Sequence, residues 1–290
     1  MDSPKSRNWF YNLGPGIIAA TSFGITDASS KFVFASGVDV LTLALFRGFV
    51  GLAMMAAYLR ISPPSQPQSW QTVWTQLGLG ILFAGIIYGI FKALELVPVS
   101  IAILTYFIYP LLTGIAGAIF GIDKLTWRGG VSALAAFFGL MLMIRAHPED
   151  QSILGIAFGV FAALCRVAVL LIARAKLNDA DARLTTWYSL VSSTILFSAF
   201  ALALMNWNNP QSTVGWVATF AVSITTAIAT LAIFISTARI GPFRTGMIMN
   251  LEPLLATILS VPLLGEVVTP MQALGGAIML VALVAFQLRR

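Results

Sequence analysis

The segment Pro110-Leu111-Leu112 recurs as Pro253-Leu254-Leu255, 143 residues further along the chain. Other features repeat at the same distance: Gly16-Ile17-Ile18-Ala19-Ala20 with Gly159-Val160-Phe161-Ala162-Ala163, Lys31 with Arg174, Asp123 with Glu266, and Thr126 with Thr269. Pro98 matches Pro242 when the shift is one residue longer. Because the chain has 290 residues, the repeat predicts two related halves, residues 1–146 and 147–290. Chance similarity between two leucine-rich stretches is the alternative interpretation.

The composition is that of a polytopic membrane protein. Hydrophobic residues make up 58% of the chain and charged residues only 10%, whereas a soluble domain carries about 25% charged residues. Such a chain cannot cover a water-facing surface, which argues against a soluble globular enzyme. About 20 apolar residues cross one bilayer core, so ten spans fit within the length of the chain.

Apolar stretches separated by proline, asparagine, aspartate or paired charges predict ten transmembrane helices. The first five run from Leu13 to Phe34, Val40 to Arg60, Val73 to Leu94, Val99 to Phe120 and Trp127 to Arg145. The second five run from Ile153 to Arg174, Arg183 to Met205, Val214 to Thr237, Phe243 to Leu264 and Val268 to Leu288. The predicted fold class is an all-α polytopic membrane protein with ten transmembrane helices.

The charges of the predicted loops orient the chain in the membrane. Twelve lysines and arginines lie on the side of the N-terminus, whereas the other side has only Lys31, Lys92 and Arg145. Because basic residues are enriched in cytoplasmic loops, we expect both termini to be cytoplasmic. Five spans in each half mean that the second half enters the membrane upside down. Inverted repeats are typical of secondary transporters, which bind substrate near the midplane between the halves.

Residue types argue against several other functions. The net charge is +6 but no basic run is present, so we expect no nucleic-acid binding. With Cys165 and His147 as the only residues of their kinds, the chain cannot form an intramolecular disulfide or a zinc site of His and Cys. A G-x-x-x-x-G-K-[ST] loop for ATP is also absent. We expect no metal, no cofactor and no signal peptide, since the first apolar stretch is long enough to be a retained span.

Three stretches resemble EamA-type transporters of the drug/metabolite transporter superfamily. They are Ala93-Leu94-Glu95-Leu96-Val97-Pro98-Val99-Ser100, Glu252-Pro253 followed by Leu264-Gly265-Glu266-Val267-Val268-Thr269, and Arg47 in the second span. The resemblance covers the whole chain and implies two inverted five-helix repeats in the cell inner membrane. Gly121-Ile122-Asp123 departs from the Gly-Glu of the family's first half. We interpret Asp123 and Glu266, at opposite membrane faces, as interfacial caps.

The resemblance also implies a class of function. Members of this family mostly export amino acids, other metabolites or drugs, and the aromatic content is similar to that of the YddG-type aromatic amino-acid exporters. We therefore expect a secondary transporter, not an enzyme, that exports small organic solutes, amino acids including aromatic ones. Its expected partners are a small-molecule solute and the lipid bilayer, with the chain acting as a monomer. The alternatives are a lipid or polyprenyl-carrier flippase of the same fold and a multidrug exporter.

Ionisable residues inside the predicted spans are candidates for substrate binding or coupling, because each costs about 2.5–3.5 kcal/mol at the bilayer centre. Glu252 is a candidate acceptor for a proton or a substrate amine, or it forms a structural ion pair with Arg166 or Arg47. Arg166 is a candidate for binding a substrate carboxylate, or it reaches the cytoplasmic interface. Asp27 and Lys31 share a helical face and either line a cavity or neutralise each other. We interpret Arg47 as structural.

Uncharged polar side chains in the spans complete the predicted substrate site. Tyr88, Tyr106 and Tyr109 carry hydroxyl groups that lipid cannot satisfy, which favours a tyrosine-lined cavity for amphipathic or aromatic solutes. The alternative interpretation is that these tyrosines lie at the membrane interface, which is more credible for Tyr88 than for Tyr106 and Tyr109. Thr226 and Asn250 add further polar groups in spans eight and nine.

Prolines and small residues indicate how the helices bend and pack. Pro98, Pro110, Pro242 and Pro253 are predicted to bend the central helices at symmetric places and to act as hinges. Pairs of glycines four residues apart, in spans three, four and six, predict close helix packing there.

Overall fold

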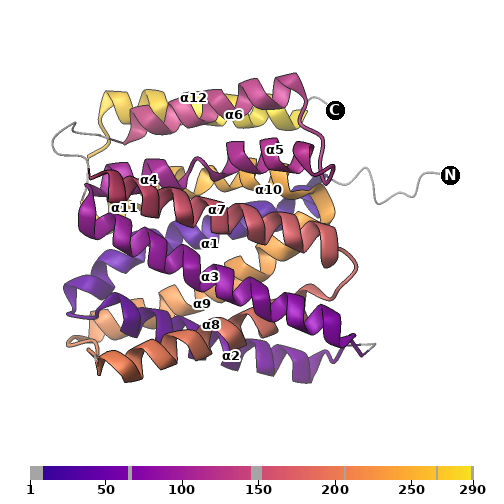
Figure 1. Cartoon of the computed structure of the whole chain (residues 1–290). Helices are drawn as coiled ribbons and strands as arrows, with labels where there is room; N and C mark the ends of the chain where they lie inside the picture. Colours follow the sequence, from indigo (N-terminus) through magenta and orange to yellow (C-terminus); the bar gives the residue numbers. More distant parts are fainter. Residues whose placement is uncertain (1–8, 65–66, 145–151, 206, 266, 289–290) are drawn as a thin grey trace.

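The computed structural model describes residues 9–64, 67–144, 152–205, 207–265 and 267–288. These residues form helices and no strand, which confirms the all-α prediction. The helices are α1 (Trp9–Ala35), α2 (Val40–Ile61), α3 (Trp70–Leu96), α4 (Val99–Tyr106), α5 (Tyr109–Ile119), α6 (Trp127–Met143), α7 (Ile153–Lys176), α8 (Ala182–Leu204), α9 (Thr213–Ile240), α10 (Pro242–Met249), α11 (Leu251–Leu264) and α12 (Pro270–Leu288) (Figure 1).

The helices of the second half repeat those of the first. A shift of 143 residues places α1 to α6 on α7 to α12 with every helix end matched to within two residues, and it places α4 on α10 without any difference. Helices α1 and α7 begin at opposite ends of the bundle (Figure 1). The predicted boundary at residues 146–147, and with it His147, lies outside the described residues.

The fourth and ninth predicted spans are each broken into two helices. Helix α4 ends at Tyr106 and α10 ends at Met249, four residues before Pro110 and Pro253 respectively. A proline ring clashes with the carbonyl group four residues earlier and lacks an N–H to donate, so neither helix continues through its proline. The sequence predicted a bend at these positions, and the structure shows a short break in the helix, at residues 107–108 in the first half and at Asn250 in the second.

The other two prolines lie at the starts of the same short helices. Pro98 is the residue before α4, and Pro242 is the first residue of α10. Proline is favoured at a helix start because its N–H would have no partner there. The four prolines therefore delimit α4 and α10 as two short helices of the same length in equivalent places.

The helices pack in pairs that the repeat relates to each other. Helix α3 packs against α7 and α8, and its counterpart α9 packs against α1 and α2. Helices α6 and α12 pack against each other and form an outer layer at the top of Figure 1. The two broken spans, α4 with α5 and α10 with α11, lie beside this layer. The break in each span faces the long central helices.

Small residues bring the two halves into close contact. A Cβ atom on Gly89 of α3 would lie 2.9 Å from the carbonyl oxygen of Phe158 in α7, and one on Gly85 would lie 3.1 Å from a sulfur atom of α7. On α7, Gly155 and Gly159 lie against the end of α3 and against α4 in the same way. The close packing predicted for the glycine pairs of spans three and six is confirmed.

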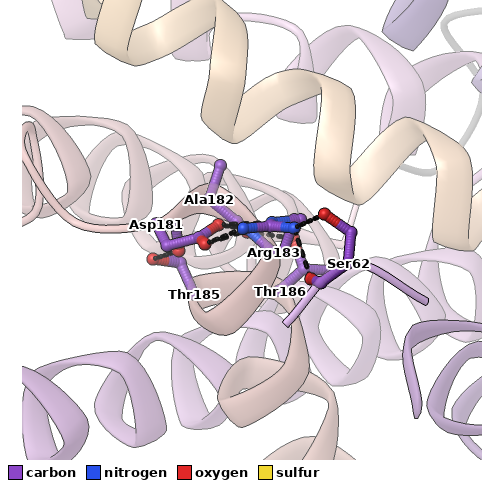
Figure 2. A network of polar contacts seen from close by, with 6 residues as sticks. All are labelled: Ser62, Asp181, Ala182, Arg183, Thr185 and Thr186. Atoms are coloured by element: carbon purple, nitrogen blue, oxygen red, sulfur yellow. Dashed lines mark hydrogen bonds and ion pairs between the residues drawn. The ribbon is translucent and has the colours of Figure 1, made fainter. Parts of the chain in front are cut away.

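A polar network joins α2 to the start of α8 (Figure 2). Asp181 accepts hydrogen bonds from the backbone N–H of Arg183 at 2.8 Å and from its Nη2 at 2.6 Å. Nη1 of Arg183 donates to the carbonyl oxygen of Ser62 at 2.6 Å. These hydrogen bonds to Arg183 hold the pKa of the Asp181 carboxyl group below its ordinary value. The network fixes the loop before α8 to the end of α2, at one end of the bundle.

Among the described residues, seven helical segments are long and apolar enough to cross a membrane when each broken pair is counted as one segment. They are Val40–Ile61, Trp70–Leu96, Val99–Ile119, Ile153–Lys176, Ala182–Leu204, Thr213–Ile240 and Pro242–Leu264. Trp127–Met143 and Pro270–Phe286 are shorter apolar helices. The chain is therefore a multi-pass membrane protein.

The contact between α3 and α8 gives a test of the packing. A Cβ atom on Gly80 would collide with the side chain of Ser192 and with the backbone carbonyl of Ser189. We expect Gly80→Val to destabilise the purified protein by about 1–3 kcal/mol, because backbone atoms cannot move aside as a flexible side chain can. Gly78→Val is the matched control, since a Cβ at Gly78 would meet no atom within 4 Å. Equal thermal unfolding midpoints for the two variants would contradict this packing.

Candidate functional site

A cavity of about 500 Å³ lies among the long helices of both halves. Its wall is built from α1, α2, α3 and α4 of the first half and from α7, α8, α9 and α11 of the second. We refer to it as the central cavity. Its volume is within the range of about 300–1,000 Å³ that is typical of small-molecule sites.

The central cavity reaches one end of the bundle and is closed at the other. At the open end its wall includes Lys31 and Phe34 of α1, Leu94 of α3, Val99 of α4 and Leu264 of α11. At the closed end α5 packs closely against α10. The repeat relates this pair to α11 and α4, whose described residues make no comparable contact. Equivalent helices are thus in contact at one end and apart at the other.

Polar contacts hold the closed end together. Nη1 of Arg239 donates to the carbonyl oxygen of Tyr11 at 2.7 Å, and its guanidinium group lies 4.0 Å from the centre of the Tyr11 ring. The backbone N–H of Phe243, at the start of α10, donates to Oδ2 of Asp123 at 3.2 Å. This contact confirms the interpretation of Asp123 as a cap, whereas Glu266 lies outside the described residues.

Arg166 of α7 lies inside the bundle and does not reach the interface. Its side chain is only 5% exposed, and its Nε donates to the hydroxyl oxygen of Tyr106 at 2.8 Å. The guanidinium carbon lies between 5.6 and 5.9 Å from the ring centres of Phe23, Phe83, Tyr106 and Tyr109. Aromatic faces attract cations, so these four rings stabilise the charge in the absence of an ion pair.

One nitrogen of this guanidinium group has no hydrogen-bond partner. Nη1 of Arg166 is buried, and no described residue accepts a hydrogen bond from it. An unsatisfied buried donor costs about 1–3 kcal/mol, and a charged donor costs more. The wall of the central cavity therefore contains a cation whose hydrogen-bonding capacity the described residues do not fully satisfy.

Asp27 of α1 and Glu252 of α11 meet in the same cavity. Helices α1 and α11 pack against each other, and a Cβ atom on Gly24 of α1 would lie 3.2 Å from the carbonyl oxygen of Glu252. Among the described side chains, no arginine nitrogen lies within 4.0 Å of either carboxyl group. The alternative of an ion pair between Glu252 and Arg166 or Arg47 is therefore not seen among the described side chains. We call Asp27 and Glu252 the carboxyl pair.

Arg47 of α2 lies in the wall of the central cavity, a position that the sequence analysis did not expect. We interpreted it as structural, yet it lines the central cavity with Asp27, Glu252 and Arg166 and interacts electrostatically with all three. Its position in the sequence gave no signal, because α2 was not expected near the contact between the halves. In the structure α2 packs against α8 and α9, which turns Arg47 toward the cavity.

The predicted uncharged residues are divided between the cavity and its surroundings. Tyr106 and Thr226 line the central cavity. Tyr109 is buried beside Arg166 but is not part of the lining. Asn250 is buried at the interruption between α10 and α11, also away from the lining. Tyr109 and Asn250 therefore lie behind the cavity wall and do not face the cavity.

Tyr88 is placed outside the site. Its side chain is 50% exposed on the outer surface of α3, and its ring contacts that of Phe158 with a centroid distance of 5.9 Å. The alternative interpretation of Tyr88 as a surface tyrosine is the correct one. One turn further along α3, Lys92 and Glu95 form an ion pair of 2.7 Å.

The charges define the chemistry that the central cavity can accommodate. Two guanidinium groups, of Arg47 and Arg166, and the carboxyl pair share one chamber with several aromatic rings. This arrangement suits a small organic solute that carries opposite charges and an apolar part. Within the described residues no group of three or more His, Cys, Asp or Glu side chains could hold a metal ion.

Comparisons with known proteins identify the family. The model of the EamA-like transporter family matches twice, at residues 14–145 and 153–286. A relative described as "Uncharacterized transporter sll1319", from Synechocystis sp., is 24% identical over 222 residues, which cover 74% of this chain and 67% of the relative. A solved crystal structure of a protein superimposes with a TM-score of 0.82 at 18% identity, covering 96% of this chain and 97% of that one. The two family matches span most of both halves, and the chain therefore belongs to the EamA-like transporter family.

Proposed function

We propose that the chain is a secondary transporter that exports small organic solutes, with amino acids, including aromatic ones, as the substrate class. The observation that carries this proposal is the unpartnered Nη1 of Arg166 in the wall of the central cavity. Arginine keeps its charge and matches the geometry of a carboxylate. A substrate carboxylate would supply the hydrogen-bond acceptor that the protein itself does not provide.

The opposite end of an amino acid finds complementary groups across the cavity. An α-ammonium group is a donor of three hydrogen bonds and has no acceptor. Glu252 and Asp27 are acidic, line the same chamber, and form no ion pair with a described arginine. The proposed pose therefore directs the carboxylate to Arg166 and the ammonium group to the carboxyl pair.

The lining also suits an aromatic side chain. Phe23, Phe83, Phe107 and Tyr106 contribute aromatic rings to the cavity wall. Aromatic rings prefer offset or edge-to-face contacts with one another, each worth about 0.5–1.5 kcal/mol beyond the burial of apolar area. These contacts would favour phenylalanine or tryptophan over a small polar amino acid.

We further propose that the ten helical segments are ten spans of the cell inner membrane with both termini cytoplasmic. The closed end of the bundle carries the basic residues Arg174, Arg183, Arg239 and Arg244 at helix ends. Basic residues are enriched on the cytoplasmic side. The central cavity would then open to the opposite side of the membrane, as expected of an exporter in its releasing state.

Alternating access follows from the difference between the two ends. In the opposite state α5 and α10 would separate while α4 and α11 come together, because the repeat makes the two arrangements equivalent. The interruptions before Pro110 and Pro253 would let each short helix move without the rest of its span. Energy would come from the solute gradient or from protons.

Uptake into liposomes tests the substrate class. We expect saturable uptake of radiolabelled phenylalanine and tryptophan by the purified protein, with weaker uptake of threonine. Arg166→Lys should reduce the initial rate at low substrate concentration by at least about tenfold, because an ammonium group cannot form the bidentate contact. Arg60→Lys, at an exposed position, is the matched control and should transport normally.

Two results would contradict this proposal. An unchanged rate in Arg166→Lys would remove Arg166 from the substrate site. Absence of uptake of every amino acid by a folded sample would exclude this substrate class and favour lipid, polyprenyl-carrier or drug cargo.

Cysteine labelling tests the side to which the central cavity opens. In a Cys165→Ala background, Ser30→Cys places a thiol in the cavity wall, and Ala173→Cys places one at the equivalent buried position 143 residues later. We expect a membrane-impermeant maleimide added from outside the cell to label Ser30→Cys and not Ala173→Cys. Labelling of Ala173→Cys alone, or of Ser30→Cys only from the cytoplasmic side, would contradict the proposed orientation.

A further inference from the structure

We propose that the part of the central cavity between α3 and α9 binds the side chain of the solute, and that it selects a flat apolar side chain that carries a hydrogen-bond donor, such as the indole N–H group of tryptophan. We call this part the side-chain subsite, and its wall consists of Phe83, Ile87, Thr226 and Thr230. The inference deepens the proposed function and rests on it for the carboxylate and ammonium groups of the solute. The subsite can also be tested with fragments that carry neither group.

The repeat gives this subsite two unlike walls. A shift of 143 residues places Phe83 of α3 on Thr226 of α9, and it places Ile87 on Thr230. Residues four apart lie on one face of a helix, so each helix presents its pair to the cavity. Equivalent positions are therefore apolar in the first half of the chain and polar in the second.

Aromatic contacts bring the two walls together beside Arg166. The rings of Phe83 and Phe234 meet edge to face, with a centroid distance of 5.9 Å and an interplanar angle of 87°. Phe234 follows Thr230 by about one helical turn and shares its face of α9. The centre of the Phe83 ring also lies 5.7 Å from the guanidinium carbon of Arg166. A solute whose carboxylate binds Arg166 would therefore place its side chain between these walls.

The hydroxyl groups of the cavity wall direct their hydrogens toward the main chain. Oγ1 of Thr230 donates to the carbonyl oxygen of Thr226 at 2.8 Å. Five further residues of the wall donate in the same way to a carbonyl oxygen of their own helix: Ser30, Ser189, Ser193, Thr257 and Ser260. A hydroxyl group has one hydrogen and two lone pairs. Each of these side chains therefore keeps an acceptor for the solute after its hydrogen is used.

The direction of these hydrogen bonds determines which solute groups the subsite favours. A donor on the solute can bind the oxygen of Thr230 while the hydroxyl group keeps its bond to α9. An acceptor on the solute would have to draw the hydrogen away from the carbonyl group of Thr226, so one hydrogen bond would be lost for the one gained. An indole N–H is a donor only, and its apolar ring suits Phe83 and Ile87. The subsite therefore favours tryptophan over an aromatic side chain that has no donor.

Two amino acids of nearly the same shape test the donor. In 3-(3-benzothienyl)alanine a sulfur atom replaces the indole N–H group of tryptophan. We expect the purified protein to bind tryptophan about fivefold more tightly in isothermal titration, because only tryptophan donates to Thr230. Equal affinities, or tighter binding of the sulfur analogue, would overturn the inference.

Thr230→Val removes the acceptor and keeps the shape of the side chain. We expect this variant to bind tryptophan about fivefold more weakly and to bind the sulfur analogue as the wild type does, which also shows that the variant folds. Persistence of the preference for tryptophan in Thr230→Val would overturn the role of Thr230.

Thr237→Val is the matched control on the same helix. Thr237 lies about two turns beyond Thr230, is 1% exposed, and donates to the carbonyl oxygen of Ile233 at 2.8 Å. It does not line the central cavity. Thr237→Val should keep the preference for tryptophan, and loss of the preference in this variant would mean that the effect is not specific to the subsite.

Indole and benzothiophene separate the subsite from the proposed substrate class, because neither carries a carboxylate or an ammonium group. By saturation-transfer NMR we expect both to bind the wild type, with indole the tighter, and we expect Thr230→Val to weaken the binding of indole alone. If the fragments behave in this way and no amino acid binds, the substrate class fails and the subsite stands. Failure of indole to bind, or equal weakening of both fragments, would overturn the subsite.

Discussion

The charge of Arg166 is the constraint around which the site is organised. A guanidinium group inside a membrane protein is stable only where aromatic rings, polar groups or water replace bulk solvent. Here four rings and the hydroxyl group of Tyr106 surround it, and the carboxyl pair lies in the same chamber. One donor is nevertheless left without a partner. A site that stabilises a cation incompletely suits an anionic ligand group, and this is the basis of the proposal that it binds a carboxylate.

The repeat would allow this site to take part in alternating access. Because α4 and α10 are equivalent short helices, the contact of α5 with α10 has a counterpart between α11 and α4 that the structure leaves open. The two ends of the bundle thus show the two arrangements that one set of helices can adopt. The cap from Asp123 to the start of α10 belongs to the closed arrangement. Exchange between them would expose the same cavity to each side in turn.

Much of the architecture could be predicted because it depends on local chemistry. The clash of Pro110 and Pro253 with the preceding turn places the interruptions, and the repeat of 143 residues pairs the helices. The direction of each side chain could not be predicted in the same way. Helices that are apolar on all sides do not reveal which face is buried. The sequence therefore did not place Arg47 at the cavity and kept Tyr88 as a candidate for it, whereas Arg47 lines the cavity and Tyr88 lies on the outer surface.

The measurement that tests the central claim most directly compares phenylalanine with phenethylamine, which lacks only the carboxylate. Isothermal titration of the purified protein should show binding of phenylalanine at least about tenfold tighter than that of the amine, corresponding to about 1.4 kcal/mol from the contact with Arg166. Equal affinities, or tighter binding of phenethylamine, would show that the unpartnered guanidinium nitrogen does not recognise the substrate, and would contradict the account.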